Sequence, residues 1–155
     1  MTPFDRIAFV AIFAFAPLHA TPVISEFLAR NANSLIDGNR DSSDWIEIHN
    51  SANASVALEN YHLTDDPDQL NKWTFPFGTS LTSDERLVVF ASSKNRLSGE
   101  LHTNFSLSGS GGYLALIDPQ GNIVSEFNDY PDQQDDTSYG ISSSCLLYTS
   151  DAADE

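Results

Sequence analysis

Short runs of β-forming residues, separated by clusters of Asn, Asp, Gly, Ser and Pro, make up the chain from Val23 onward. No stretch keeps the apolar spacing of a helix for three turns, which indicates an all-β chain. Residues 45–49 alternate, so Ile46 and Ile48 share one face of a strand. Trp45 lies on the other face and is too large to stay bare, which predicts partial cover there. Many short strands at this spacing predict a two-sheet β-sandwich.

Six further strands are predicted along the chain. They are residues 23–28, 58–63, 72–77, 87–91, 113–117 and 122–127. The run 87–91 is apolar throughout, which predicts a central strand buried on both faces. Pro76 predicts a sheet edge or a strand end in the run 72–77. The connection 118–121 has Pro second and Gly fourth, which predicts a type I hairpin turn between the last two strands.

The acidic stretch at residues 128–140 follows the last of these strands and has few apolar anchors. We interpret it as the final loop or edge of the domain. One domain is therefore predicted over residues 21–140, with a linker starting at residues 141–144. A domain of this length can bury a substantial core.

The first 20 residues have the layout of a signal peptide. Residues 7–18 form an apolar run after Arg6, and the small residue Ala20 precedes a predicted cleavage site. A membrane-spanning helix needs about 20 apolar residues, so this run is too short for an ordinary anchor, and no later run is better. We expect a secreted, periplasmic or cell-surface protein with no membrane span after the signal peptide is cleaved.

The C-terminal residues 145–155 have no strand alternation and no relation to the preceding sequence. They match, residue for residue, the translation of a common transposase sequencing adapter read from its second base. We interpret this segment as non-native and expect the natural chain to continue beyond Ser144. The only cysteine, Cys145, belongs to this segment. The rest of the chain therefore has no disulfide, thiolate–zinc site or cysteine nucleophile, and its core has to stabilise it.

Acidic residues outnumber basic residues by 22 to 7, which gives a net charge of −15. Nucleic acids and anionic membranes attract clustered Lys and Arg, so this charge disfavours both as partners. The excess of acid favours solubility, with cation binding as the alternative interpretation.

One loop places oxygen-bearing side chains at alternating positions: Asp37, Asn39, Asp41 and Asp44. Calcium prefers six to eight oxygen ligands, so this loop is a candidate calcium site. The EF-hand pattern fails, because Ser42 stands where that loop needs Gly and Ile48 stands where it needs Glu. A solvated turn capped by Asp and Asn side chains is the other interpretation. No other metal site or cofactor is predicted.

No catalytic residues are predicted. Two further acidic groups are interpreted as solvated turns; they are Asp65, Asp66 and Asp68, and Asp132, Asp135 and Asp136. His49, His62 and His102 are far apart in sequence, and none has a predicted nucleophile or ligand partner. Residues 109–112 do not form a nucleophile elbow and predict a loop. Six aromatic residues are core candidates, with a carbohydrate-stacking platform as the alternative; they are Trp45, Trp73, Phe75, Phe77, Phe90 and Phe105.

Seven short segments follow one another in the order and spacing of a known family. They are SEF at 25–27, DWIEIHN at 44–50, YHLTDD at 61–66, KWTFP at 72–76, LVVFAS at 87–92, LHTNFSL at 101–107 and GYLAL at 112–116. Together, across residues 22–140, they resemble the lamin tail domain of bacterial exported proteins. The resemblance implies an Ig-like sandwich and brings no established catalytic set.

The resemblance also implies a function. It indicates a non-catalytic interaction or structural module near the N-terminus of a larger exported or cell-surface bacterial protein, with a protein or cell-surface partner. One alternative is an accessory domain of an exported hydrolase whose catalytic domain follows Ser144. Another alternative is a calcium-dependent adhesion module that uses the loop of Asp37. A catalytic domain downstream would favour the hydrolase, and more sandwich repeats or a surface anchor would favour the non-catalytic module.

Overall fold

The computed structural model describes residues 21–141 and the backbone of residues 147–151. Eleven strands lie in these residues and form three antiparallel sheets. The predicted signal peptide, residues 1–20, and residues 142–144 of the predicted linker lie outside the described residues, whereas Ile141 ends β10. Within the described part of the chain, no helix has the length and apolar character needed to cross a bilayer.

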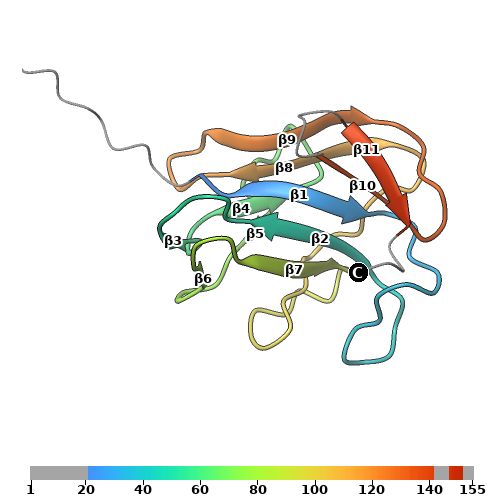
Figure 1. Ribbon diagram of the computed structural model, residues 1–155, viewed down its shortest axis with the longest axis horizontal. Coiled ribbons are helices and arrows are strands. Elements are labelled where there is room, and N and C mark those ends of the chain that lie inside the picture. The colour runs from blue at the N-terminus through green and yellow to red at the C-terminus, as the bar shows by residue number, and fades with distance from the viewer. Residues whose placement is uncertain (1–20, 142–146, 152–155) are drawn as a thin grey trace, which may run out of the picture.

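The larger sheet has five strands in the order β11-β10-β1-β2-β7. These strands are β1 Val23–Leu28, β2 Asp44–His49, β7 Arg86–Ala91, β10 Thr137–Ile141 and β11 Leu147–Asp151. Figure 1 shows β1, β2 and β7 lying side by side, with β10 and β11 beyond β1. The predicted first strand at residues 23–28 is confirmed with its bounds.

The second large sheet has the order β5-β4-β8-β9, and β3 and β6 form a separate pair. These strands are β3 Val56–Ala57, β4 His62–Thr64, β5 Trp73–Thr74, β6 Ser80–Leu81, β8 Gly112–Ile117 and β9 Ile123–Tyr130. Gly121 closes the turn between β8 and β9 by donating its N–H to the Asp118 carbonyl at 3.0 Å. The hairpin prediction is therefore confirmed. The two large antiparallel sheets also confirm the predicted all-β, Ig-like two-sheet sandwich.

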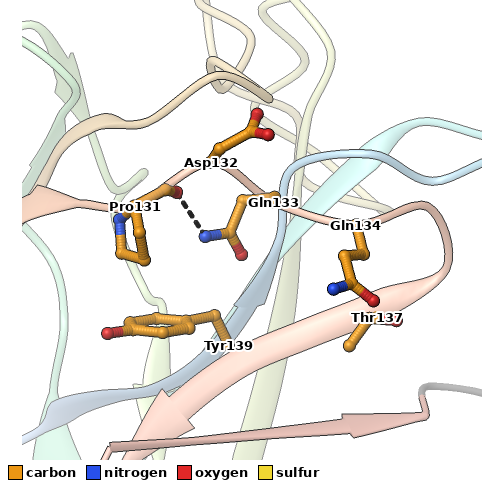
Figure 2. Close-up of a pocket in the computed structure, with 6 residues that line it drawn as sticks. All are labelled: Pro131, Asp132, Gln133, Gln134, Thr137 and Tyr139. Carbon is orange, nitrogen blue, oxygen red and sulfur yellow. Dashed lines mark hydrogen bonds between the residues drawn. The ribbon is translucent and has the colours of Figure 1, made fainter.

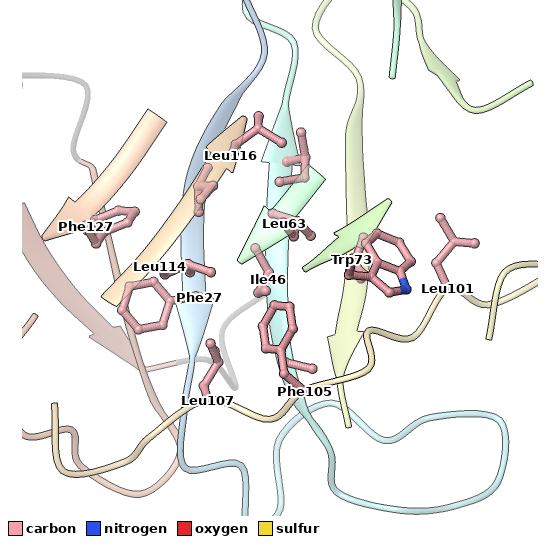
Figure 3. Packing of buried hydrophobic residues seen from close by; sticks show 14 of the residues in the cluster. Phe27, Ile46, Leu63, Trp73, Leu101, Phe105, Leu107, Leu114, Leu116 and Phe127 are labelled. Atoms are coloured by element: carbon pink, nitrogen blue, oxygen red, sulfur yellow. The ribbon is translucent and has the colours of Figure 1, made fainter. Parts of the chain in front are cut away.

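Side chains from both large sheets meet in one buried core (Figure 3). Phe27 and Ile46 come from the five-stranded sheet, and Leu114 and Phe127 come from the four-stranded sheet. Leu101, Phe105 and Leu107, from the connection between β7 and β8, add to the same core. The burial of these apolar side chains, worth about 25 cal/mol per Å² of surface removed from water, holds the two sheets together.

A second, smaller cluster covers the outer face of the five-stranded sheet. Leu28, Trp45 and Phe90 are buried there, and Val88 packs against them. Trp45 is 3% exposed, which confirms the predicted cover on the face opposite Ile46.

A β-bulge in β1 changes which of its residues face the core. The register between β1 and β2 shifts between Ile24 and Glu26. Strict alternation would place Ile24 and Phe27 on opposite faces. Both are in the main core, because the bulge inserts an extra residue between them.

Strand β7 is the terminal strand of its sheet, so the prediction of a central strand was wrong. An irregular segment covers its C-terminal half. The Phe90 N–H donates to the Leu101 carbonyl, and the Thr103 N–H donates to the Phe90 carbonyl, both at 2.9 Å. At the start of β7, Leu87 and Val88 are half-buried. An all-apolar run can therefore lie at an edge when loop backbone takes the place of a neighbouring strand.

Two predicted strands are shorter than expected. The run 58–63 is interrupted by a turn, in which Tyr61 donates its N–H to the Leu58 carbonyl at 3.0 Å and Asn60 has a φ of 64°. Only its last two residues join β4. In the run 72–77, only β5 forms, at the edge of the four-stranded sheet, as Pro76 predicts.

The stretch 128–140, interpreted as the final loop or edge of the domain, has a strand at each end, and β9 forms an edge of the four-stranded sheet. Strand β9 continues to Tyr130, and β10 pairs with β1, with Glu26 opposite Gly140. A Cβ at Gly140 would lie 2.5 Å from the Ser25 carbonyl oxygen. The close approach of β10 to β1 therefore requires glycine at this position.

Strand β11 pairs antiparallel with β10 from residue 147 to residue 151, although no strand is predicted in residues 145–155. An edge strand presents its N–H and C=O groups to any extended segment nearby, whatever the side-chain pattern of that segment. Backbone pairing therefore explains β11 without alternation. The interpretation of residues 145–155 as a translated adapter stays a prediction.

Candidate interaction surface

The loop between β1 and β2 is organised around the Asp37 carboxylate, which is 2% exposed. It accepts hydrogen bonds from the backbone N–H groups of Asn39 (2.9 Å) and Asp41 (3.0 Å) and from the Ser43 hydroxyl (3.0 Å). Lys94 bonds to Asp37 and lies 2.9 Å from Asp41 Oδ2. Burial raises the pKa of Asp37, but these hydrogen bonds, with that of Lys94 the strongest, outweigh it and hold the pKa below its usual range.

Of the four candidate calcium ligands, the structure brings two together. Asp37 and Asp41 both contact the ammonium group of Lys94, so a positive charge of the protein itself lies between the two carboxylates. Asn39 Oδ1 accepts a hydrogen bond from Arg96 (2.8 Å), and Asp44 accepts one from a backbone N–H of the same loop (3.4 Å). In the part of the chain that the structure describes, no group of three or more His, Cys, Asp and Glu is placed to hold a metal ion. Calcium binding by this loop stays a prediction.

His102 is fully buried between a serine and a glutamate, which its isolated position in the sequence did not predict. Its Nδ1 lies 2.8 Å from Ser92 Oγ, and its Nε2 lies 3.5 Å from Glu100 Oε2. The imidazole stacks on the Phe90 ring with 5.2 Å between the ring centroids. Full burial keeps the imidazole out of contact with solvent. Its contacts with Ser92 and Phe90 hold the segment after β7 against that strand.

The buried imidazole predicts that stability falls when the pH drops below the ordinary pKa of histidine. Burial lowers the pKa of His102, and the positive charge of Arg96 lowers it further. The unfolded chain therefore binds a proton more readily than the folded chain, and the free energy of unfolding decreases as the pH falls below 6.5. We expect the urea midpoint to fall more between about pH 7 and about pH 5 in the wild-type chain than in a His102→Gln variant. Equal pH slopes in the two proteins would contradict this expectation.

The other acidic turns are held by ion pairs and backbone hydrogen bonds. Asp65 lies 2.7 Å from Lys72 Nζ, and Asp132 lies 3.4 Å from a terminal nitrogen of Arg30. Asp136 accepts two backbone N–H groups of the loop between β1 and β2. These carboxylates therefore connect turns to their neighbours.

The two remaining described histidines each contact one polar neighbour. His49 Nε2 lies 2.9 Å from Asp84 Oδ1, in the turn before β7. His62 Nδ1 lies 2.9 Å from Thr74 Oγ1, on the adjacent strand β5. Both contacts join neighbouring parts of a sheet, which is a structural role.

A small pocket lies beside the connection between β9 and β10 (Figure 2). Its lining residues are Pro131, Asp132, Gln133, Gln134, Thr137 and Tyr139, and its volume is about 70 Å³. Gln133 Nε2 donates to the Pro131 carbonyl at 2.6 Å within this wall. Sites for small organic ligands have volumes of about 300–1,000 Å³, so this pocket is too small to be one.

Five of the six candidate aromatic residues are at most 4% exposed, which confirms that they are core residues. They are Trp45, Trp73, Phe75, Phe90 and Phe105. Phe77 is the exception, because 93% of it is exposed to solvent. It lies in the turn between β5 and β6.

Phe77 lines an open groove with a volume of about 440 Å³. Leu97, from the loop after β7, lines the same groove and is 48% exposed. Leu81 and Leu101 also line it and are only 1% and 7% exposed, so they form its floor. The groove is thus an open depression at the margin of the main core, lined by polar as well as apolar residues, with two exposed apolar side chains at its rim.

The sequence of the chain matches the model of a known domain family. A family model described as Lamin Tail Domain matches residues 18–130 of the 155-residue chain. The chain belongs to the lamin tail domain family. The match includes the strands β1 to β9, and with them the groove of Phe77, whereas β10 lies beyond it. A search of curated proteins finds no match to the chain.

The groove of this lamin tail domain was missed by reasoning from the sequence. Phe77 was grouped with the core aromatics because it follows Trp73 and Phe75 at strand spacing. A signal was nevertheless present, since Phe77 stands between Pro76 and Gly78. A large aromatic residue between Pro and Gly lies in a turn, where no strand face can bury it.

Proposed function

We propose that this lamin tail domain is a non-catalytic binding module of a larger exported bacterial protein, with a protein or cell-surface partner. Phe77 carries the proposal, because a large aromatic ring is 93% exposed beside an open groove that has buried leucines at its floor. Exposed apolar surface is unfavourable in water, and contact with a partner removes it. Aromatic side chains are also enriched in protein interfaces.

The state of the polar side chains supports binding over catalysis. Asp37 and Asp41 are bonded to Lys94, so their charges are already compensated within the protein. His102 is fully buried and packs against Phe90. Membership of an Ig-like, non-catalytic family agrees with this interpretation. These groups therefore stabilise loops, whereas Phe77 and Leu97 are exposed at the groove.

Export is supported by the first 20 residues, where an apolar run follows Arg6 and a small residue precedes Thr21. Expression of the full chain, with an epitope tag, in a bacterium with general secretion tests this part. We expect to find the protein outside the cytoplasm with Thr21 as its first residue. Retention in the cytoplasm with residues 1–20 attached would contradict export.

Binding to a surface partner is tested with the purified full chain and intact cells or isolated envelopes of the source bacterium. We expect binding that saturates and that unlabelled chain displaces. The same chain unfolded by heat is the matched control, and it should bind without saturation. Binding of the folded chain that never saturates would contradict a specific partner.

A further inference from the structure

The rim of the groove carries two exposed apolar side chains from separate loops. Phe77 is 93% exposed and Leu97 is 48% exposed, and both line the groove. Single exposed apolar residues are common on protein surfaces, but two that border one opening mark a candidate contact site. Both therefore border the same opening.

The floor of the groove is continuous with the core. Leu81 and Leu101 belong to the main cluster, and Leu87 packs against it. The volume of about 440 Å³ is sufficient for a bulky side chain together with adjoining backbone. An apolar side chain placed here would therefore be buried on one side by core residues and at the rim by Phe77.

The turn that carries Phe77 is held in place by hydrogen bonds. The Thr79 hydroxyl donates to the Pro76 carbonyl at 2.8 Å, and the Leu58 N–H donates to the Thr79 carbonyl at 2.8 Å. Gly78 has a φ of 81°, a conformation that glycine adopts without strain. The ring is therefore exposed on an ordered turn, and less conformational entropy is lost on binding than for a flexible loop.

Two carboxylates lie at the groove or next to it. Glu85 lines it, and the Glu59 carboxylate accepts the Gly78 N–H at 3.3 Å. The described residues that line the groove include no Lys or Arg. Since the whole chain also has a net charge of −15, a basic partner is attracted and a second copy of the chain is repelled.

We propose that this groove binds a peptide segment of a partner protein that presents a bulky aliphatic side chain flanked by Lys or Arg. The aliphatic side chain packs between Phe77 and Leu97 onto the leucine floor. The flanking cations lie near Glu85 and Glu59. This inference rests on the proposed binding function and adds the site and the chemistry of the partner.

A synthetic peptide with a central Leu, flanked on both sides by Lys and Arg, tests the proposal with the full chain in isothermal titration calorimetry. We expect saturable binding that weakens by at least about tenfold in a Phe77→Ser variant, because the bound Leu would lose its contact with the aromatic ring, and aromatic residues that a partner buries contribute strongly to binding. A Leu97→Ser variant should also bind more weakly. An Ile123→Ser variant is the matched control, because Ile123 is 45% exposed but does not line the groove.

Two control peptides separate the parts of the proposal. Replacing the central Leu by Gly should abolish binding, and replacing the cations by Asp should weaken it strongly at low salt. Equal affinity of the Phe77→Ser variant and the wild type, or equal affinity of the Leu and Gly peptides, would overturn the proposal. A dimer of the full chain that Phe77→Ser dissociates in sedimentation equilibrium would assign the groove to a second copy and would also overturn it.

The peptide titration and the cell-binding experiment test the two proposals separately. If the peptide does not bind but the chain still binds cells saturably, the partner chemistry is wrong and the binding module stands. If neither binds, both are wrong.

Discussion

Replacing Phe27 with Ala is expected to lower the free energy of unfolding by about 3–5 kcal/mol. Phe27 is fully buried, and its ring centroid lies 5.1 Å, 4.8 Å and 5.7 Å from those of Phe127, Tyr130 and Tyr139. These three rings come from β9 and β10, which are fixed in different sheets. They cannot all move into the space that Ala leaves, so a cavity remains. Reversible urea unfolding, followed by tryptophan fluorescence and circular dichroism, measures the change.

The matched control for this variant is Ile123→Ala. Ile123 is hydrophobic and lies on β9, but it is 45% exposed, so its loss should change the free energy of unfolding by about 0.5 kcal/mol or less. The dependence of the free energy on urea concentration should be the same in both variants. A loss below about 1 kcal/mol in Phe27→Ala would contradict the placement of this ring between the two sheets.

Replacing Asp37 with Asn is expected to destabilise the domain by about 2 kcal/mol at neutral pH, the range of a buried hydrogen bond to a charged group. The substitution keeps the shape of the side chain but removes the negative charge that Lys94 and two backbone N–H groups contact. Asp41→Asn is the matched control, because Asp41 also contacts Lys94 but its side chain is 62% exposed. Its effect should stay below about 1 kcal/mol, as for other exposed ion pairs.

The effect of Asp37→Asn should depend on pH. The pKa of Asp37 is lower in the folded chain than its ordinary value of 3.8. The stabilisation by this carboxylate is therefore fully present above that value and is lost as the pH falls below it, through the lower pKa of the folded state. We expect the difference in urea midpoint between wild type and variant to shrink as the pH is lowered from about 5 to about 2. A difference that stays constant over this range would contradict the assignment of the ion pair.

The face of a strand that enters the core, and the turn that joins two neighbouring strands, were predictable from the sequence. The alternation around Ile46 gave the face of β2 that enters the core, and the size of Trp45 gave the cover of the other face. The turn with Gly121 at its end gave the β8–β9 hairpin. Each of these depends on residues a few positions apart, so local pattern was sufficient.

The candidate sites were less predictable, because they join segments that are distant in the chain. The sequence of the Asp37 loop predicts calcium ligands, but only the fold shows that Lys94, 57 positions away, contacts this loop. Ser92 and His102 are ten positions apart, and only the path of the chain along β7 brings them together. No local pattern contains these pairs, so their roles needed the fold.

The sequence by itself determined that this chain is all-β, where β1, β2, β7, β8 and β9 lie, and that it forms a two-sheet sandwich. The tertiary structure alone decided that β7 is an edge strand, that a bulge puts Ile24 and Phe27 on one face, and that Phe77 stays exposed. The physical reason is that strand formation and turns depend on neighbouring residues, whereas burial depends on what distant segments bring to cover a side chain. Phe75 and Phe77 show this most clearly, since they are two residues apart and are 1% and 93% exposed.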